Sequence, residues 1–416
     1  MTMLATTNNN AHAGNFSPLS HTSVVATGTR MVGPDILRSL AILLVMLVHL
    51  PLNATPGQLV TVREHGWLGV DIFFVLSGYL IGTQLFKEVT RTGAVDFKSF
   101  YLRRAFRIFP AFFVVLGLYA LVPVLRDNPT MQPLWKFATF TVNLGFDPRE
   151  GNTFSQAWTL AVEEQFYLVL PLLVLLLYER IGAGWGLAVA GLLTLSGVVL
   201  RYAIWDIQVG SLVAEGQFRP AFATYLRDVY YPTYTRLDGL LFGVVLAAAR
   251  FFKPELCRQY LPPKVTIPAG LIFVIAALIC FVDRGPLAGQ GIFPVFQAQL
   301  GAVAGFPLIS IGIALLFCAM LDLEHVLGRW PVPGAALVAT LSYSLYLTHK
   351  SVFHVMRIIF GEENLQGTIG FVAYLIGSFA VAAVLWFCVE RTFLHLRNNV
   401  LRKPNDGAFA TVSQIS

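Results

Sequence analysis

The sequence predicts an all-α polytopic membrane protein with about ten transmembrane helices and with both termini in the cytoplasm. Three observations support this fold class. Hydrophobic residues make up 56% of the 416 residues and charged residues only 12%, about half of the charged share of an average soluble domain. The mean hydropathy is +0.66. Apolar runs of about 20 residues, the length that crosses a bilayer, recur along the chain.

Ten apolar runs are long enough to be transmembrane spans. They cover residues 35–52, 68–86, 108–125, 157–178, 185–204, 236–252, 265–282, 301–321, 335–358 and 369–391. An arrangement with the N-terminus inside places most lysines and arginines on the cytoplasmic side, most densely over 87–107, as the positive-inside rule requires. The net charge of +6 therefore reflects membrane orientation and does not indicate nucleic-acid binding.

The chain is expected to divide into two tails and one membrane domain. Residues 1–33 are polar and lack the apolar stretch of a cleavable signal peptide, so they predict a disordered cytoplasmic tail. Residues 34–393 form the membrane domain, and residues 394–416 form a second cytoplasmic tail. The four cysteines show neither a CxxC motif nor a Cys/His ligand spacing, so we expect no disulfide framework and no metal site.

The first span carries two ionisable residues, in the stretch ILRSLAILLVMLVHL. Pro34 and Asp35 are typical of a helix start. Arg38 and His49 lie eleven positions apart, which on a helix places them within about 20° of one face and about 16 Å apart along the axis. A charge within the bilayer costs at least about 2.5–3.5 kcal/mol. One face of this helix should therefore line a polar cavity.

This pattern resembles the first helix of the acyltransferase family 3, which are bacterial membrane O-acyltransferases. Further motifs follow in the family's order: GVDIFFVLSGYLIG, FYLRRAFRIFP, AWTLAVEEQFYLVLPLL, TRLDGLLFGVVLA, LSYSLYLTH and VERTFLHLR, together covering about 35–397. FYLRRAFRIFP looks like the family's basic loop. Ser39 and Thr392 stand where the family usually has glycine and proline.

The resemblance implies a multi-pass O-acyltransferase in the plasma membrane of a bacterium. It would move an acyl group, usually acetyl, from cytoplasmic acyl-CoA to a hydroxyl of an extracytoplasmic carbohydrate such as exopolysaccharide or O-antigen. Acylation of a macrolide-type glycosylated metabolite is the alternative. The expected partners are the carbohydrate acceptor and the bilayer, with no nucleic acid. The chain has no room for the soluble domain that some members carry, so it would act alone or with polysaccharide-assembly proteins.

The expected catalytic residues are His49, Glu163 and Asp71. A histidine near neutral pKa suits removal of a hydroxyl proton, and direct transfer and an acyl-histidine intermediate both stay open. Glu163 and Glu164 cannot face one small site, because adjacent helical residues point 100° apart. The family pattern favours Glu163 as the inner carboxylate, pairing with an arginine or orienting His49. Asp71 could hold His49 in one tautomer, or serve only as an N-terminal helix charge.

The expected donor-binding residues are Arg38, Arg103, Arg104 and Arg107. Arg104 and Arg107 would point the same way on a helical segment, and guanidinium groups suit the phosphates of acyl-CoA. Spacing alone favours ordinary positive-inside anchoring, whereas the resemblance to the family's Arg-x-x-Arg favours donor binding.

The expected substrate-binding residues are Arg236, Asp238, Tyr346 and His349. Arg236 and Asp238 cannot pair well with each other at i, i+2 on a helix, so each needs another partner, an acceptor sugar or a cavity residue. Ser342, Tyr346 and His349 form one polar stripe on an otherwise apolar span.

A transporter without chemistry of its own is the competing hypothesis, because buried charges among many spans are common to both classes. Transporters often show inverted repeats and paired broken helices, and this sequence shows neither. A proton-relay or sensor protein is a third hypothesis.

Overall fold

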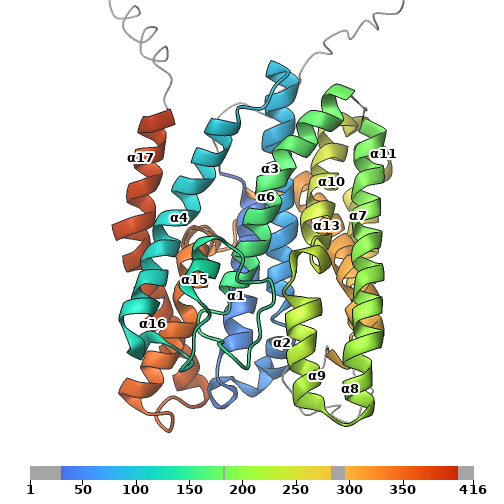
Figure 1. Cartoon of the computed structure of the whole chain (residues 1–416). Coiled ribbons are helices and arrows are strands. Elements are labelled where there is room, and N and C mark those ends of the chain that lie inside the picture. Colours follow the sequence, from blue (N-terminus) through green and yellow to red (C-terminus); the bar gives the residue numbers. More distant parts are fainter. Residues whose placement is uncertain (1–29, 181–182, 283–295, 402–416) are drawn as a thin grey trace, which may run out of the picture. The chain divides into compact units, whose positions relative to one another are not determined.

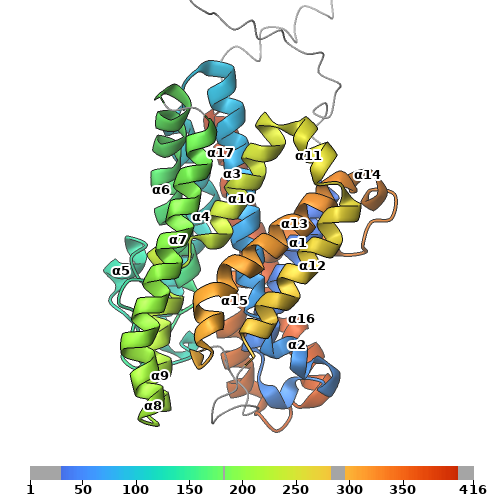
Figure 2. The same cartoon turned by 90° about the vertical axis from the view of Figure 1, so that its right-hand side faces the viewer.

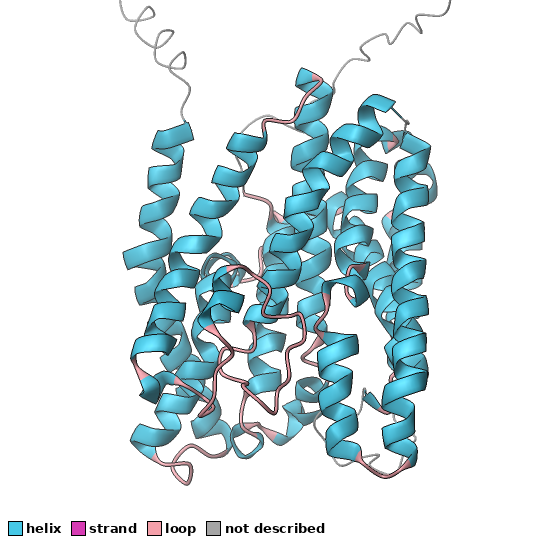
Figure 3. Cartoon of the chain, in the orientation of Figure 1, coloured by secondary structure: helices cyan, strands magenta, loops and turns pink. Residues whose placement is uncertain are grey.

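The computed structural model describes residues 30–180, 183–282 and 296–401, and this part of the chain contains only helices and loops (Figure 3). The helices are α1 (Val32–His49), α2 (Val60–Glu64), α3 (Leu68–Thr92), α4 (Phe97–Leu121), α5 (Leu134–Ala138), α6 (Ala157–Arg180), α7 (Ala183–Ile204), α8 (Gly210–Ala214), α9 (Phe218–Tyr225), α10 (Asp238–Phe252), α11 (Pro254–Tyr260), α12 (Pro263–Cys280), α13 (Phe306–Asp322), α14 (Glu324–Leu327), α15 (Ala335–Phe360), α16 (Gly367–Leu385) and α17 (Arg391–Leu401).

Each predicted span corresponds to one long helix. Within the described ranges, eight helical segments are long and apolar enough to cross a membrane. The other two predicted spans are α10, which has only 15 residues, and α15, which carries the polar stripe. The chain is therefore an all-α polytopic membrane protein, as predicted, although eight segments rather than ten meet the requirement of length and hydropathy. The cytoplasmic placement of the termini stays a prediction.

The first and last described helices are α1 and α17, and the division into two tails and a membrane domain stays a prediction. Helix α1 begins at Val32, where the backbone N–H groups of Val32 and Gly33 donate to the carboxylate of Glu324 (2.5 and 2.9 Å). A carboxylate satisfies the free donors of a helix N-terminus and its positive partial charge. At the other end, α17 continues to Leu401, so residues 394–401 are helical. Residues 1–29 and 402–416 lie outside the described residues.

The basic segment expected as a loop is helical, which is a correction to the sequence prediction. Helix α4 begins at Phe97, eleven residues before the predicted span. Asp96 caps it by accepting hydrogen bonds from the backbone N–H and the hydroxyl of Ser99 (3.0 and 2.6 Å), as a good N-cap does. Arg103, Arg104 and Arg107 therefore lie on a rigid helix.

Small residues let the central helices approach closely. A Cβ atom at Gly78 of α3 would fall on the carbonyl oxygen of Leu240 in α10, and one at Gly243 of α10 would fall on the carbonyl oxygen of Val75. Such contacts drive helix association in membranes, where apolar burial gives little driving force. Figures 1 and 2 show α3 and α10 side by side. Gly78 and Gly243 thus allow the backbones of α3 and α10 to approach each other closely.

Helix α1 packs against both α3 and α15. The Ser39 hydroxyl lies 2.7 Å from the carbonyl oxygen of Ala335 in α15, so this departure from the family's usual glycine adds a contact between the two helices. Arg38 and His49 both belong to α1, and α15 carries the polar stripe. The two helices that hold the predicted site residues are thus neighbours.

Aromatic stacking holds the segment between α5 and α6 against α4. The ring centroid of Phe154 lies 4.7 Å from that of Tyr119 and 5.7 Å from that of Phe137, and Phe140 stacks on Phe112 at 4.9 Å. Phe140 and Phe154 adopt positive φ angles of 52° and 57°, which non-glycine residues rarely do. The packing therefore places the residues that directly follow Phe154 in a defined position at the start of α6.

Candidate active site

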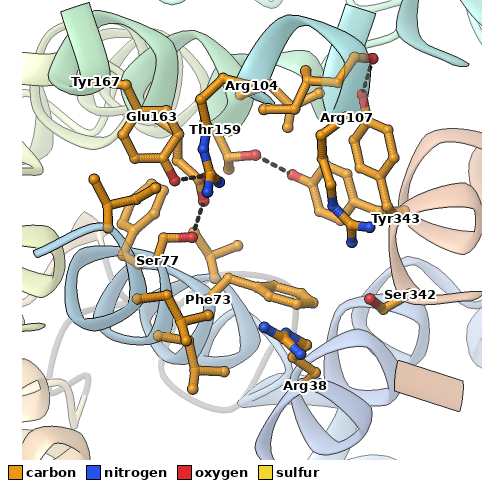
Figure 4. Close-up of a pocket in the computed structure, with 18 residues that line it drawn as sticks. Arg38, Phe73, Ser77, Arg104, Arg107, Thr159, Glu163, Tyr167, Ser342 and Tyr343 are labelled. Carbon is orange, nitrogen blue, oxygen red and sulfur yellow. Dashed lines mark hydrogen bonds between the residues drawn. The ribbon is translucent and has the colours of Figure 1, made fainter. Parts of the chain in front are cut away.

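A cavity of about 150 Å³ lies among α1, α3, α4, α6 and α15 (Figure 4). Its polar lining includes predicted residues from four of these helices. They are Arg38, Arg104, Arg107, Glu163, Ser342 and Tyr346. Apolar side chains such as Phe73, Leu80 and Ile108 complete the wall. The cavity is thus an apolar pocket with a few convergent polar groups, which is the usual composition of a small-molecule site.

Three arginines reach this cavity from two helices. Arg38 extends from α1, and Arg104 and Arg107 extend from the first half of α4 (Figure 4). Arg38 lies 3.3 Å from Asp35, and Arg107 lies 3.3 Å from the buried Glu390. The side chains of Arg38 and Arg107 remain 29% and 38% exposed, so both guanidinium groups are accessible to an anionic ligand. The predicted i, i+3 alignment of Arg104 and Arg107 is confirmed.

Arg103 does not join this group. Its guanidinium lies 3.5 Å from Glu88 of α3, and it is not among the residues that line the cavity. Adjacent residues on a helix point about 100° apart, so only one of Arg103 and Arg104 can face the pocket. In the structure, Arg104 lines the cavity and Arg103 does not.

Glu163 lies in the cavity wall and bonds to two hydroxyl groups. Ser77 donates to its Oε1 at 3.1 Å, and Tyr167 donates to its Oε2 at 2.7 Å (Figure 4). These hydrogen-bond partners are neither an arginine nor His49, the two alternatives expected from the sequence. Glu163 is the inner carboxylate of the pair, as expected, because Glu164 is not among the lining residues. Ser77 also lines the cavity.

Tyr346 lies at the boundary between this cavity and a histidine pair. Its hydroxyl lies 2.5 Å from the hydroxyl of Thr159 and 2.9 Å from the carbonyl oxygen of Gln156, both at the start of α6. Its ring lines the cavity, and the ring centroid of His349 is 6.1 Å away. The polar stripe therefore leads from the arginine-lined pocket to the histidines.

The histidine pair joins α1 to α15. His49 is the last residue of α1, and its ring lies 5.0 Å from that of His349, measured between centroids. Nδ1 of His49 is 2.8 Å from the carbonyl oxygen of Val45 and 3.3 Å from Nε2 of His349. The His49 side chain is accessible to solvent, whereas His349 is fully buried. Nε2 of His49 is thus the ring nitrogen left for a substrate.

Sequence reasoning missed a polar cluster next to this pair. Lys350 follows His349 directly and forms an ion pair with Asp127 at 2.6 Å. Its ammonium also donates to the hydroxyl of Ser155 at 2.8 Å. A lysine in the middle of an apolar span is itself a signal of function by the rule that singled out Arg38. Asp127 and Ser155 come from a loop and carry no such signal.

Asp71, Arg236 and Asp238 lie in a separate buried group of four charges. Asp71 pairs with Arg236 at 2.9 Å, and Asp238 pairs with Arg201 at 2.8 Å. The side chains of all four are at most 4% exposed. The guanidinium of Arg236 also lies 3.7 Å from the ring centroid of Phe306. Arg236 and Asp238 therefore each have another partner, as expected, but that partner is a charged residue of the protein and not a cavity group.

Asp71 does not orient His49 in this structure. It bonds to Arg236, and the backbone carbonyl of Val45 takes the position next to Nδ1 of His49. None of the four buried charges is among the residues that line the cavity. No group of histidine, cysteine and carboxylate side chains suited to a metal occurs among the residues that the structure describes.

The arrangement supplies the components of acyl transfer. The arginines offer donors for an anionic ligand, the cavity admits an uncharged chain, and Nε2 of His49 offers a base or nucleophile. Arg38 and His49 mark the two ends of this route on one helix, about 16 Å apart.

Comparison with known proteins agrees with this chemistry. A family model described as an acyltransferase domain matches residues 31–387. A putative O-acetyltransferase of Staphylococcus aureus strain MSSA476 is 28% identical over 360 residues, which cover 82% of this chain and 54% of the relative. O-acetyltransferase OatA of S. aureus strain NCTC 8325 is 26% identical over 366 residues, which cover 83% of this chain and 53% of OatA.

The chain thus spans about half the length of the relatives it matches. No solved structure matches it. The family match nevertheless includes every helix that lines the cavity and both histidines of the pair. This protein belongs to the acyltransferase 3 family.

Proposed function

We propose that this protein is a membrane O-acyltransferase that transfers an acetyl group from acetyl-CoA to a hydroxyl of an extracytoplasmic carbohydrate. The observation that carries the proposal is the placement of three arginines and His49 around one route through the bundle. Arg38, Arg104 and Arg107 surround one cavity, and the stripe on α15 continues from this cavity to His49. The similarity to O-acetyltransferases supports acetyl as the transferred group.

The donor would bind with its phosphates at the arginines. Guanidinium groups form bidentate, charge-assisted bonds to phosphate. The uncharged pantetheine arm would then enter the apolar part of the cavity, past Phe73 and Ile108, and bring the thioester towards Tyr346. The bilayer orientation that places the arginine end in the cytoplasm is the one expected from the distribution of lysine and arginine.

His49 would perform the proton transfer. In direct transfer, Nε2 accepts the proton of the acceptor hydroxyl while the hydroxyl oxygen bonds to the thioester carbonyl carbon. The carbon–sulfur bond breaks, and the proton passes to the leaving thiolate, giving the ester and free CoA. In the covalent route, Nε2 attacks the carbonyl first, CoA leaves, and the acceptor hydroxyl then displaces the imidazole. Both routes need an unprotonated Nε2.

The acceptor is proposed as a glycan of the cell envelope, such as exopolysaccharide or O-antigen. The accessible position of His49 at the end of α1 suits an acceptor too large to enter the cavity. In the orientation proposed here, this end faces the outside of a bacterial plasma membrane. Proteins of polysaccharide assembly are the proposed partners, because they would present such an acceptor.

The experiment compares ester content in a deletion strain that carries the wild-type gene, His49→Ala or His65→Ala. His65 is a matched control, because it also bonds a carbonyl oxygen four residues earlier, that of Thr61 at 2.8 Å, and lies outside the cavity lining. Alkali-labile esters are counted by NMR on envelope glycans and on secreted glycosylated metabolites. We expect esters with wild type and His65→Ala and none with His49→Ala.

The expected loss is at least about 10²–10⁴-fold in rate, the usual contribution of general acid–base catalysis. Equal ester content with well-expressed wild-type and His49→Ala proteins would overturn the proposal. An ester found only on a secreted metabolite would support the acyltransferase activity but would show that the acceptor is a metabolite and not an envelope glycan.

A further inference from the structure

We propose that His349 is a positioning residue for His49, taking the place that a carboxylate occupies behind the histidine of a hydrolase triad. The proposal rests on the proposed function only in that His49 is the group that handles the proton. Its evidence is the geometry of the two rings and of the two backbone carbonyls that bond to them.

The protonation of His349 follows from its backbone contact. Nδ1 of His349 lies 3.0 Å from the carbonyl oxygen of Leu345. A carbonyl oxygen can only accept a hydrogen bond, so Nδ1 carries the hydrogen. In the neutral ring the other nitrogen, Nε2, is then a bare acceptor, and it is the atom that faces His49.

The protonation of His49 follows in the same way. Nδ1 of His49 lies 2.8 Å from the carbonyl oxygen of Val45, so this nitrogen also carries its hydrogen. That one hydrogen points between two acceptors, the Val45 carbonyl and Nε2 of His349. A shared hydrogen explains why the second distance, 3.3 Å, is longer than a simple hydrogen bond. Nε2 of His49 is therefore unprotonated and ready to act as a base.

The second acceptor matters most when His49 is charged. When Nε2 takes a proton, the ring becomes an imidazolium and its Nδ1–H becomes a charge-assisted donor, roughly twice as strong as a neutral one. His349 is the only side chain of the described residues that bonds to the His49 ring. No carboxylate among those residues hydrogen-bonds either ring, so the neutral imidazole of His349 supplies the stabilisation that a carboxylate gives elsewhere.

The surroundings keep His349 in place. Its ring is fully buried and packs against Phe353 and Tyr346, with centroids 5.9 and 6.1 Å away. The neighbouring Lys350 is held by Asp127 and Ser155. A buried polar atom without a partner costs about 1–3 kcal/mol. If the imidazole of His349 had no function, an apolar side chain would fill this space at a lower cost in free energy.

The test compares His349→Gln with His349→Leu. The glutamine oxygen can occupy the position of Nε2 and accept the same hydrogen bond, whereas leucine fills the space without an acceptor. Purified protein in liposomes is assayed with acetyl-CoA, and release of CoA thiol is followed in the presence of an acceptor glycan extracted from the deletion strain. Phe353→Leu controls for lost packing around the ring.

We expect His349→Leu to lower kcat by about 10²-fold, within the range of one acid–base contribution, with the KM for acetyl-CoA unchanged. His349→Gln should recover most of this loss, to within about tenfold of wild type, because a hydrogen bond to a charged group is worth about 1.5–3 kcal/mol. Phe353→Leu should keep the wild-type kcat. The unfolding midpoint of each variant shows whether the protein is folded.

A folded His349→Leu protein with wild-type kcat would overturn the inference. Equal loss of kcat in the leucine and glutamine variants would do the same, because a merely structural ring gives no advantage to the hydrogen-bond acceptor. Failure of the proposed function is distinguishable, since His49→Ala would then retain thioester turnover whatever the His349 variants show.

Discussion

Two groups of charged residues lie within this helical bundle, and they differ in how far their charges are exposed. In the buried group, two arginines face two aspartates in ion pairs of 2.8 and 2.9 Å, and every side chain is at most 4% exposed. In the cavity group, three arginines share space with one lining carboxylate, Glu163, and two of them are about one-third exposed. Both groups contain ion pairs, but the first group is sealed from solvent, whereas Arg38 and Arg107 of the second stay partly exposed beside Asp35 and Glu390.

This difference shows what an ionisable residue in a membrane segment indicates. The rule that such residues are functional applies equally to Arg236 and to Arg104 in the sequence. Only the structure shows that the Asp71–Arg236 pair is sealed from solvent, whereas Arg38 and Arg107 stay partly exposed at the cavity. We therefore interpret the buried group as a structural connection between helices and the cavity group as the donor site.

The largest expected effect comes from removing one charge of the buried group. Asp71→Asn leaves the buried Arg236 without its counter-charge, and loss of one partner of a buried pair costs about 3–5 kcal/mol. We expect little monodisperse protein after detergent extraction, measured by size-exclusion chromatography, and a lowered unfolding midpoint for what remains.

The double variant Asp71→Asn with Arg236→Gln removes both charges and should regain much of the lost stability. If Asp71→Asn instead gives a stable protein that lacks activity, Asp71 is the catalytic residue that the sequence predicted and the two groups are not distinct.

A smaller effect is expected in the cavity. Arg104→Gln and Arg107→Gln should each raise the KM for acetyl-CoA by about ten- to a hundredfold, because one charge-assisted hydrogen bond is worth about 1.5–3 kcal/mol. Stability should fall more for Arg107→Gln than for Arg104→Gln, because Arg107 pairs with the buried Glu390 at 3.3 Å. Initial rates across a range of acetyl-CoA concentrations measure the effect.

Arg103→Gln is the matched control for these two variants, because Arg103 lies on the same helix but faces Glu88. Its KM should stay within about twofold of wild type, as expected for an exposed ion pair. A rise in KM equal to that of Arg104→Gln would show that ordinary surface charge, and not the cavity, attracts the donor.

The smallest effect is expected for Glu163→Gln. The amide can keep hydrogen bonds to Ser77 and Tyr167, while the cavity loses a negative charge and becomes more favourable for phosphates. We expect kcat to fall by less than about tenfold, since no proton passes through Glu163, and the KM for acetyl-CoA to decrease. Steady-state kinetics give both values.

A loss of a thousandfold or more in kcat for folded Glu163→Gln would contradict this expectation. It would make Glu163 a catalytic residue, as the sequence predicted.

The spacing of residues along the sequence was sufficient to predict several features of the site. Arg38 and His49 share one helix, Arg104 and Arg107 both face the cavity, and Ser342, Tyr346 and His349 follow one inward stripe. Helical periodicity relates residues within one turn or a few turns, so these relations are determined by spacing alone. The start of α4 was predicted too late because the prediction placed it where the apolar run begins. Asp96 is nevertheless a recognisable N-cap.

The partners of these residues were decided by the tertiary structure. Asp71 and Arg236 are 165 positions apart, and the two histidines are 300 positions apart. Which side chains meet depends on how α1, α3, α10 and α15 rotate against one another and on the glycines that let α3 and α10 approach. The sequence by itself determined the helices, the family and the chemical groups present. Packing decided which arginines are sealed in the interior and which stay partly exposed at the cavity proposed to bind the donor.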